Sequence, residues 1–158
     1  MRLNARFNLQ EYVSKNTYLK YGDQASRFIC PTLLEADLLL CKLVEAELGH
    51  AVSCTINNWS TGGDRIASGL RMVGEPHYSI TSSHAWGRGS DKQFSHKETK
   101  ARIPNNIIYN VVLNNQGVLY LAGMRRIEHI DDAPTWLHSD TLWTPDEFVN
   151  KIQIVRAK

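Results

Sequence analysis

The sequence has little of several features that would narrow its function. Its three cysteines, Cys30, Cys41 and Cys54, form no CxxC pair. An odd number of thiols without that spacing predicts reduced structural cysteines, not a disulfide framework or a thiolate zinc site. No apolar run approaches the ~20 residues that a membrane-spanning helix needs. The opening residues 1–6 lack the apolar segment of a secretory signal. We therefore expect a protein made in a cytoplasm, with no membrane segment, which another factor must deliver if it acts outside the cell.

Neither sign of charge is in large excess. The chain has 18 Lys and Arg against 16 Asp and Glu, a formal net charge of +2. This balance gives no indication of nucleic acid as a partner, although it would not hinder approach to an anionic cell wall. With 158 residues, 42% of them hydrophobic, the sequence predicts one globular domain over residues 1–158 with a single core.

Local patterns predict an α+β fold. Capping residues and apolar stripes indicate helices over 8–13, 32–48 and 105–114. The second of these begins with a Thr32–Glu35 capping box and ends at Gly49. Alternating or β-branched segments indicate strands over 51–56, 78–81, 123–130 and 135–142, with the last two forming a hairpin. We interpret residues 14–30 as irregular, 92–102 as a solvated loop and 144–147 as a further helix start. The expected architecture is a small antiparallel sheet with helices packed on one side.

One stretch, residues 82–91, combines an imidazole and a carboxylate around a bend. His84 and Asp91 are separated by Gly87 and Gly89, which adopt turn conformations at little cost. The two side chains could therefore converge, and they are two of the three protein ligands that a catalytic zinc ion typically uses. The alternative is a capped turn with a surface histidine. His138 is the best candidate for a third ligand, because it lies on a rigid predicted strand, although it also fits an ordinary half-buried strand histidine.

Five short motifs occur in order along the chain: Asn57-Asn58-Trp59, Gly62-Gly63, Ser68-Gly69-Leu70-Arg71, Ser83-His84-x-x-Gly87-x-Gly89-x-Asp91 and Trp136-Leu137-His138-x-Asp140. Together they resemble the zinc DD-peptidase superfamily. That superfamily contains D-alanyl-D-alanine carboxypeptidases, dipeptidases and phage peptidoglycan endopeptidases, with hedgehog signalling domains as distant relatives. The likeness spans residues 7–140 and is greatest to small single-domain members encoded by bacteriophages.

The resemblance implies a Zn²⁺ ion held at the sheet by His84, Asp91 and His138. It also implies that Arg71 neutralises the oxyanion that forms when the scissile amide becomes tetrahedral. The chemistry is consistent, because zinc polarises a carbonyl and acidifies water while a fixed guanidinium stabilises developing charge. A surface arginine in a salt bridge is the alternative for Arg71.

The sequence departs from the family pattern at two positions. Gly89 stands where the family usually has alanine, and Thr135 stands where many members place the acid that serves as general base. Asp132, six residues before His138, and Glu128, in the preceding strand, are the two candidates for that base. The sequence does not decide between them, and both also fit turn or surface carboxylates.

Four further residues receive a role from the same likeness. Asn57, Trp59 and Gly63 would shape the cleft or simply pack in its wall. Asp140 would orient an imidazole or an arginine from behind the metal ligands.

The resemblance implies a zinc-dependent peptidase that hydrolyses peptidoglycan stem peptides or cross-links, encoded by a phage for host lysis or entry. Such a protein would be made in the host cytoplasm and act on the cell wall or be carried in the virion. Thr135 motivates an alternative, a catalytically weakened or inactive virion structural protein on the same zinc-binding fold, with other virion proteins as partners. A hedgehog-type signalling module is a third reading, against which the missing secretion signal and disulfides argue.

Overall fold

A computed structural model of the chain describes residues 1–156. The helices in this part of the chain are α1 (Leu9–Tyr12), α2 (Lys15–Tyr21), α3 (Pro31–Leu48), α4 (Asn105–Asn114) and α5 (Gln116–Leu121). Short 3-10 helices are η1 (Gly22–Phe28), η2 (Trp59–Thr61), η3 (Ser83–Trp86) and η4 (Asp146–Phe148). The strands are β1 (Val52–Thr55), β2 (Gly89–His96), β3 (Arg126–Glu128), β4 (Leu137–Asp140) and β5 (Gln153–Val155). These elements confirm the predicted α+β class.

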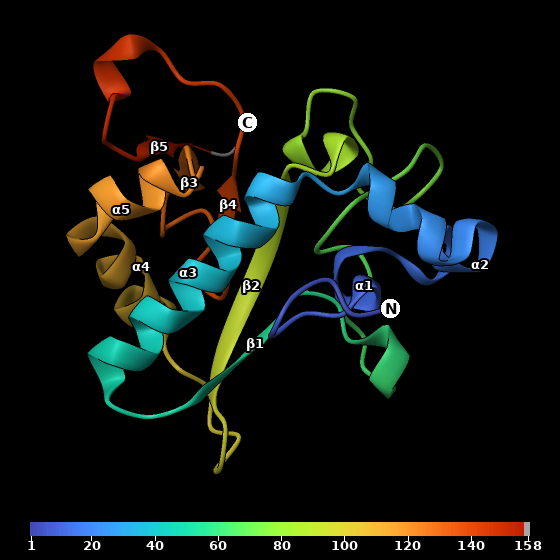
Figure 1. Cartoon of the computed structure of the whole chain (residues 1–158), viewed down its shortest axis with the longest axis horizontal. Coiled ribbons are helices and arrows are strands. Elements are labelled where there is room, and N and C mark those ends of the chain that lie inside the picture. Colours follow the sequence, from blue (N-terminus) through green and yellow to red (C-terminus); the bar gives the residue numbers. More distant parts are fainter. Residues whose placement is uncertain (157–158) are drawn as a thin grey trace.

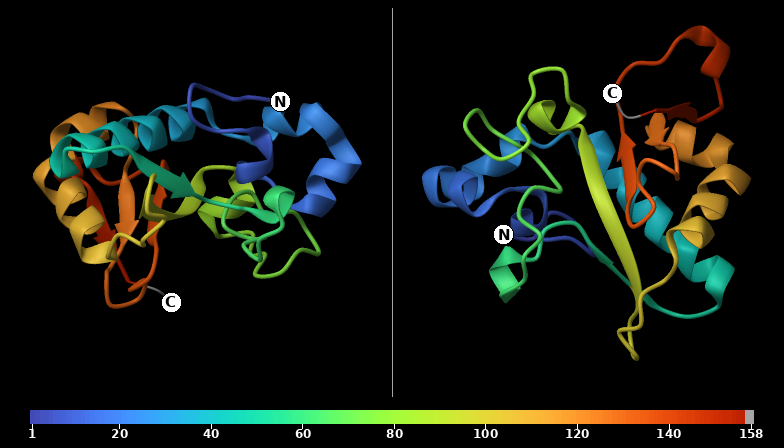
Figure 2. Two further views of the ribbon diagram at one scale, coloured as in Figure 1. Left: turned by 90° about the horizontal axis from the view of Figure 1, so that it is seen from below. Right: turned by 180° about the vertical axis from the view of Figure 1, so that it is seen from behind.

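The strands form one five-stranded sheet in the order β1-β2-β4-β3-β5. The pairs β1–β2, β2–β4 and β3–β4 are antiparallel, and the last of these is the predicted hairpin. The sheet is mixed and not wholly antiparallel, because β5 reaches the edge by a long connection and pairs with β3 in parallel. Helices α3, α4 and α5 lie on one side of the sheet (Figure 1), and the view from behind shows β2 in front of α3 with no helix over it (Figure 2). One face of the sheet is thus left for a site.

Helix starts and stops follow capping chemistry, with one displacement. Asn8 N–H donates to Glu11 at 2.8 Å, which confirms the expected start of α1, and α4 spans the predicted residues after Pro104. Gly49 ends α3 in the left-handed conformation, with φ 69°. The start of α3 lies earlier than the Thr32–Glu35 box predicts, since Pro31 takes the first helical position, which favours proline. Among residues 1–156, no helix combines the length and apolarity needed to cross a bilayer.

Four predicted segments differ from the structure. Residues 14–30 are not irregular: α2 begins where the Ser14 side chain accepts from Thr17 N–H at 3.0 Å, and η1 follows. Residues 78–81 form turns and no strand, and Ile80 is exposed. Residues 144–147 lead only into the short 3-10 helix η4. Residues 92–96 are no solvated loop, because they belong to β2.

The reason for the last difference is a buried polar network on the helix side of β2. Lys92 and Asp37 of α3 are both fully buried, and Lys92 Nζ lies 2.8 Å from Asp37 Oδ1. The Lys92 ammonium also donates to the Ser90 and Ser139 hydroxyls, each at 2.7 Å. The other oxygen of Asp37 accepts from the Tyr12 hydroxyl at 2.8 Å and from Ser90 at 2.7 Å. A charged residue can enter this strand because its ammonium is paired with Asp37 and hydrogen bonded to two serine hydroxyls.

Candidate metal centre

The topology brings the three predicted ligands to the uncovered face of the sheet. Asp91 on β2 and His138 on β4 are direct cross-strand partners, so their side chains project from the same face. His84 lies in η3, just before β2. Between His84 and Asp91, Gly87 turns the chain with φ 60°, and a Cβ at this position would overlap the carbonyl oxygen of Phe28. The bend expected from the sequence is therefore centred on Gly87, while Gly89 already begins β2.

One ligand atom from each residue meets at a single point. His84 Nε2 lies 3.3 Å from Asp91 Oδ1 and 3.2 Å from His138 Nδ1, and His138 Nδ1 lies 2.7 Å from Asp91 Oδ1. Ligands about 2.0–2.2 Å from a tetrahedral zinc ion lie about 3.3–3.6 Å from one another, close to two of these separations. The third is shorter because the imidazole and carboxylate are hydrogen bonded. These residues, called the triad below, form a group able to hold a metal ion.

Each imidazole is held so that the correct nitrogen faces the triad centre. His84 Nδ1–H donates to the carbonyl oxygen of Gly69 at 2.8 Å, which leaves Nε2 to face the other two ligands. His138 Nε2 lies 3.4 Å from Asp140 Oδ2, which leaves Nδ1 toward the centre. Arg126 in turn binds Asp140 at 2.7 Å. Such outer hydrogen bonds set the tautomer and ring orientation of metal-binding histidines, and Asp140 occupies the place expected of an orienting group.

The carboxylate of Asp91 divides its two oxygens between the imidazoles and Arg71. Arg71 Nη2 binds Asp91 Oδ2 at 3.0 Å, and its Nε donates to the carbonyl oxygen of Ala67 at 2.6 Å. Burial by itself raises the pKa of Asp91, but the neighbouring imidazoles outweigh it and hold this pKa well below its ordinary value. Burial likewise lowers the pKa of His138, yet hydrogen bonds to Asp140 and Asp91 raise it to about 9. At neutral pH and without a metal, the triad therefore holds a proton.

The backbone of residues 68–69 holds two of the ligands, a role that the sequence did not predict. The carbonyl oxygen of Ser68 accepts from Asp91 N–H at 2.8 Å, and that of Gly69 accepts from His84 as described above. A Cβ on Gly69 would overlap the carbonyl oxygen of Tyr12, so only glycine allows this close passage. Backbone acceptors leave no side-chain signature, and the glycine in the Ser68-Gly69 motif was the one available signal.

Asn57 binds that segment, and Trp59 binds the carbonyl oxygen of Val13, which Asn57 also contacts. Asn57 is buried, accepts from Ser68 N–H at 2.8 Å and donates to the carbonyl oxygen of Val13 at 3.2 Å. Trp59 Nε1 donates to the same carbonyl at 2.8 Å. Gly63 passes so close to Asn58 that a Cβ would overlap its side chain. These contacts tie the motif residues to the loop that supports the ligands.

A glycine at position 89 is explained by its neighbours. A Cβ here would overlap Ser83 Oγ and lie 3.2 Å from His138 Cε1. Ser83 Oγ itself lies 3.3 Å from His138 Nε2. With a serine at position 83, glycine at position 89 keeps the imidazole in place.

Glu128 is the candidate base that lies beside the triad. On β3, Arg126 pairs with Asp140 and Ile127 with Ser139, so extending the register by one residue sets Glu128 opposite His138. The pKa of Glu128 is raised, first by burial and then by the nearby charges of Asp91 and Asp132, against the opposing effect of His138. A raised pKa suits a carboxylate that must exchange protons near neutral pH.

The other two positions lie farther into the loop between β3 and β4. Asp132 Oδ2 is bound by Arg156 Nε at 3.1 Å, so this carboxylate takes part in an ion pair. Thr135 is exposed, and its carbonyl oxygen accepts from Gln93 Nε2 at 3.3 Å and from the Arg102 guanidinium. The geometry favours Glu128 over Asp132 as a proton acceptor next to the triad.

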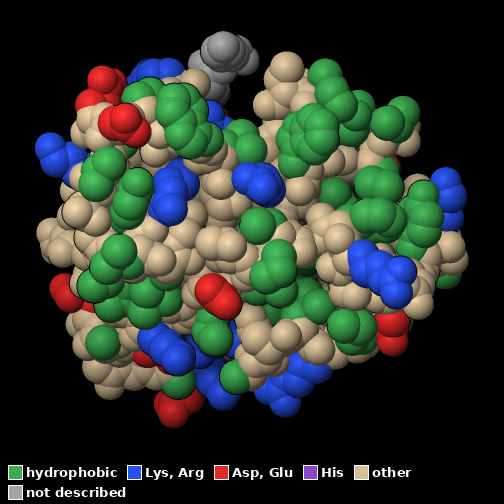
Figure 3. All heavy atoms as spheres, turned by 45° about the horizontal axis from the view of Figure 1, so that its top comes forward, with side chains coloured by type: hydrophobic (Ala, Val, Ile, Leu, Met, Phe, Trp, Pro, Cys, Tyr) green, Lys and Arg blue, Asp and Glu red, His purple; other side chains and the backbone are tan. Residues whose placement is uncertain are grey.

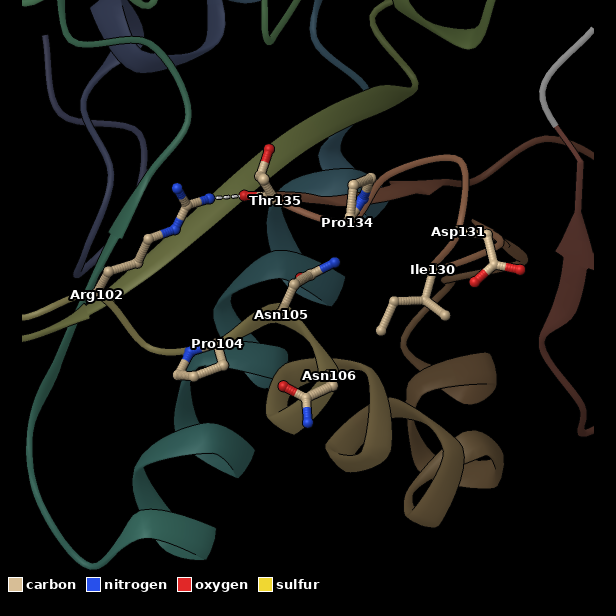
Figure 4. Close-up of a pocket in the computed structure, with 8 residues that line it drawn as sticks. All are labelled: Arg102, Pro104, Asn105, Asn106, Ile130, Asp131, Pro134 and Thr135. Atoms are coloured by element: carbon tan, nitrogen blue, oxygen red, sulfur yellow. Dashed lines mark hydrogen bonds between the residues drawn. The ribbon is translucent and has the colours of Figure 1, made fainter.

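A cavity of about 610 Å³ lies between the start of α4 and the β3–β4 loop, and Thr135 is part of its lining (Figure 4). Its lining includes Pro104, Asn105 and Ile130, and no member of the triad. Figure 3 shows a further face, where hydrophobic, basic and acidic side chains are mixed and no histidine is visible. The cavity beside Thr135 therefore does not open on the triad.

Searches against protein-family models, curated proteins and solved structures found no match to this chain. What the site can do chemically therefore follows from its own groups. Two imidazole nitrogens and one carboxylate oxygen are a donor set suited to a divalent transition metal. A second carboxylate and a guanidinium lie next to that set. This combination can bind a metal, exchange a proton and stabilise an anion.

Proposed function

We propose that the chain is a zinc-dependent peptidase that hydrolyses peptidoglycan stem peptides or their cross-links, encoded by a phage and used at the host cell wall. One observation carries the proposal: His84, Asp91 and His138, distant in sequence, direct one ligand atom each to a common point. The ordered motifs that resemble the zinc DD-peptidase superfamily supply the substrate class.

The donor set fits zinc better than the other common divalent ions. Calcium and magnesium favour shells made of oxygen atoms, whereas a pair of imidazoles with one carboxylate is typical of catalytic zinc. Both imidazoles present a fixed nitrogen to the centre. When bound there, zinc would polarise the scissile carbonyl and lower the pKa of a water molecule.

The protein's own residues would perform the remaining steps. Glu128 accepts the proton of the attacking water and delivers it to the departing amine, which is general acid–base catalysis worth about 10²–10⁴-fold in rate. Arg71 binds Asp91 at 3.0 Å, and in the proposed reaction it offsets the negative charge that develops on the carbonyl oxygen. Asp140 keeps His138 oriented throughout.

The test is to incubate purified protein with peptidoglycan, with and without a chelator, and to identify the released peptides by mass. We expect one zinc ion per chain and release that stops on chelation. His84→Ala, Asp91→Ala and His138→Ala should each abolish metal binding and release, whereas His50→Ala, at an exposed histidine, should change neither. Peptide release that persists in chelator would contradict the proposal.

The identity of the base is tested separately. Glu128→Gln should lower kcat by about 10²–10⁴-fold while zinc content stays constant. Asp132→Asn, in the carboxylate bound to Arg156, should leave kcat within a few-fold. The reverse result would assign the base to Asp132.

Thr135 supports a second candidate, a virion structural protein that keeps the metal site without the chemistry. That protein would bind zinc stoichiometrically, release no peptide from purified peptidoglycan and be found in virus particles. Stoichiometric zinc together with no released peptide would decide for this candidate.

A further inference from the structure

A polar groove with a positive charge lies next to the triad on the same side of the sheet. It has a volume of about 430 Å³. Thr55 of β1 and Gln93 of β2 are cross-strand partners in its lining, and Ser95 follows on β2. Because alternate residues of a strand share a face, Asp91, Gln93 and Ser95 project from the same side of β2. The groove therefore continues from the triad along this strand.

Three cations line this groove against one acid. Arg65, Lys100 and Arg102 contribute to the lining, with Asp64 as the acid. Within residues 1–156, none of the three cations forms an ion pair with a carboxylate. Arg65 donates to the carbonyl oxygens of Ile56 at 2.7 Å and Asp91 at 2.9 Å, which fix its position without neutralising its charge.

Two of these cations repel each other. The pKa of Arg65 is lowered, first by burial and also by the positive charge of Arg102, although Asp91 opposes the change. Arg102 is brought here by pairing with Ser95, and its guanidinium donates to the Thr135 carbonyl (Figure 4). Lys100 adopts a φ of 60° in the turn after β2. Like charges held together, with three cations against one acid in the lining and no carboxylate of the described chain within ion-pair distance of them, favour an anionic ligand.

We propose that this groove binds a carboxylate of the substrate peptide, at a position remote from the scissile amide. The inference rests on the proposed peptidase function and adds a specificity site to it. Gln93 and Ser95 lie two and four residues beyond Asp91 on β2. At about 3.3 Å per residue this is about 7–13 Å, which an extended peptide covers in two to four residues. The carboxylate recognised belongs to an acidic residue or chain terminus at that distance.

The test compares two peptides that differ only in one acidic residue, placed two to four residues from the scissile bond and replaced by its amide. We expect the intact protein to favour the acidic peptide through a lower KM. The double variant Lys100→Gln, Arg102→Gln should lose about two- to thirtyfold of that preference, as two exposed charge pairs would give, with kcat on the amide peptide unchanged. Lys97→Gln, an exposed lysine of the same turn outside the groove, is the matched control.

Calorimetric binding of both peptides to the same proteins separates this inference from the peptidase proposal. Binding that depends on the carboxylate, without hydrolysis, would overturn only the peptidase. Hydrolysis with equal KM for both peptides would overturn only the groove, and so would a preference that survives in the double variant. Circular dichroism checks that the double variant is folded, and Lys100→Gln alone, at an exposed position, provides the same test with a smaller effect.

Discussion

The ion pair between Lys92 and Asp37 provides the strongest test of how the sheet beneath the triad is held. Both side chains are 0% exposed, and Lys92 also donates to the Ser90 and Ser139 hydroxyls. Lys92→Met keeps most of the side-chain length and removes the charge. Asp37 would then be a buried anion without its counter-ion, a change that costs about 3–5 kcal/mol in comparable buried pairs. Since a domain of this size is stable by about 5–15 kcal/mol, this loss is a large fraction of the total.

Urea unfolding followed by tryptophan fluorescence measures the loss. With a dependence of about 2 kcal/mol per molar urea, a cost of 3–5 kcal/mol lowers the midpoint by about 1.5–2.5 M. Lys97→Met is the matched control, because Lys97 is an exposed lysine next to the same strand. It should change the free energy of unfolding by no more than about 0.5 kcal/mol.

A double variant shows whether the cost in unfolding free energy comes from the unpaired charge of Asp37. Lys92→Met combined with Asp37→Leu removes both charges, and it should be more stable than Lys92→Met alone. It will not recover everything, because the Tyr12 and Ser90 hydroxyls lose their acceptor. If Lys92→Met unfolds at the same urea concentration as Lys97→Met, the unpaired Asp37 charge carries no such cost. The same follows if the changes in unfolding free energy of Lys92→Met and Asp37→Leu, each measured alone, sum to that of the double variant.

The remaining predictions concern the triad and its supports. Zinc binding at pH 7 should release about one proton, measured by calorimetry in buffers of different ionisation enthalpy, because a ligating imidazole must be neutral and the pKa of His138 is about 9. The same raised pKa stabilises the metal-free fold below about pH 6.5, the unfolded value, and this contribution is lost as pH rises through 9, so its unfolding midpoint should fall over that window. Gly89→Ala should weaken zinc binding by displacing His138, and adding Ser83→Ala should recover only part of it, because the Cβ at position 83 would still lie 2.9 Å from the new methyl group; competition with a chromogenic chelator measures both. Asn57→Ala should lower zinc affinity about 10–100-fold in the same assay, because Ser68 loses the side chain that fixes it.

Elements whose signals are local could be predicted from the sequence. Helix α3 has an apolar stripe and a left-handed glycine at its end, and α4 follows a proline that fixes its start. The β3–β4 hairpin could be predicted because both segments alternate around a short polar turn. In each case the information lies within the segment itself.

Strand β2 could not be predicted, although it carries a candidate ligand and lies inside the sheet, between β1 and β4. Its residues are polar on both faces: Asp91 and Gln93 face the site, while Ser90 and Lys92 face the core. Hydropathy therefore does not alternate along most of it. The charge at Lys92 is compensated by Asp37, which lies on α3 and is distant in sequence. Only the folded chain brings the two together.

The same distinction applies to the site. Side chains that would contact the metal are of types that chemistry restricts, so His84, Asp91 and His138 could be named from the sequence, and their atoms meet in the structure. The choice of base depends instead on register, which a single sequence leaves open between Glu128 and Asp132. Pairing of β3 with β4 puts Glu128 opposite the His138 ligand, where its pKa is raised by burial. In the proposed peptidase, Glu128 on the neighbouring strand would supply the acid that the sequence lacks at Thr135.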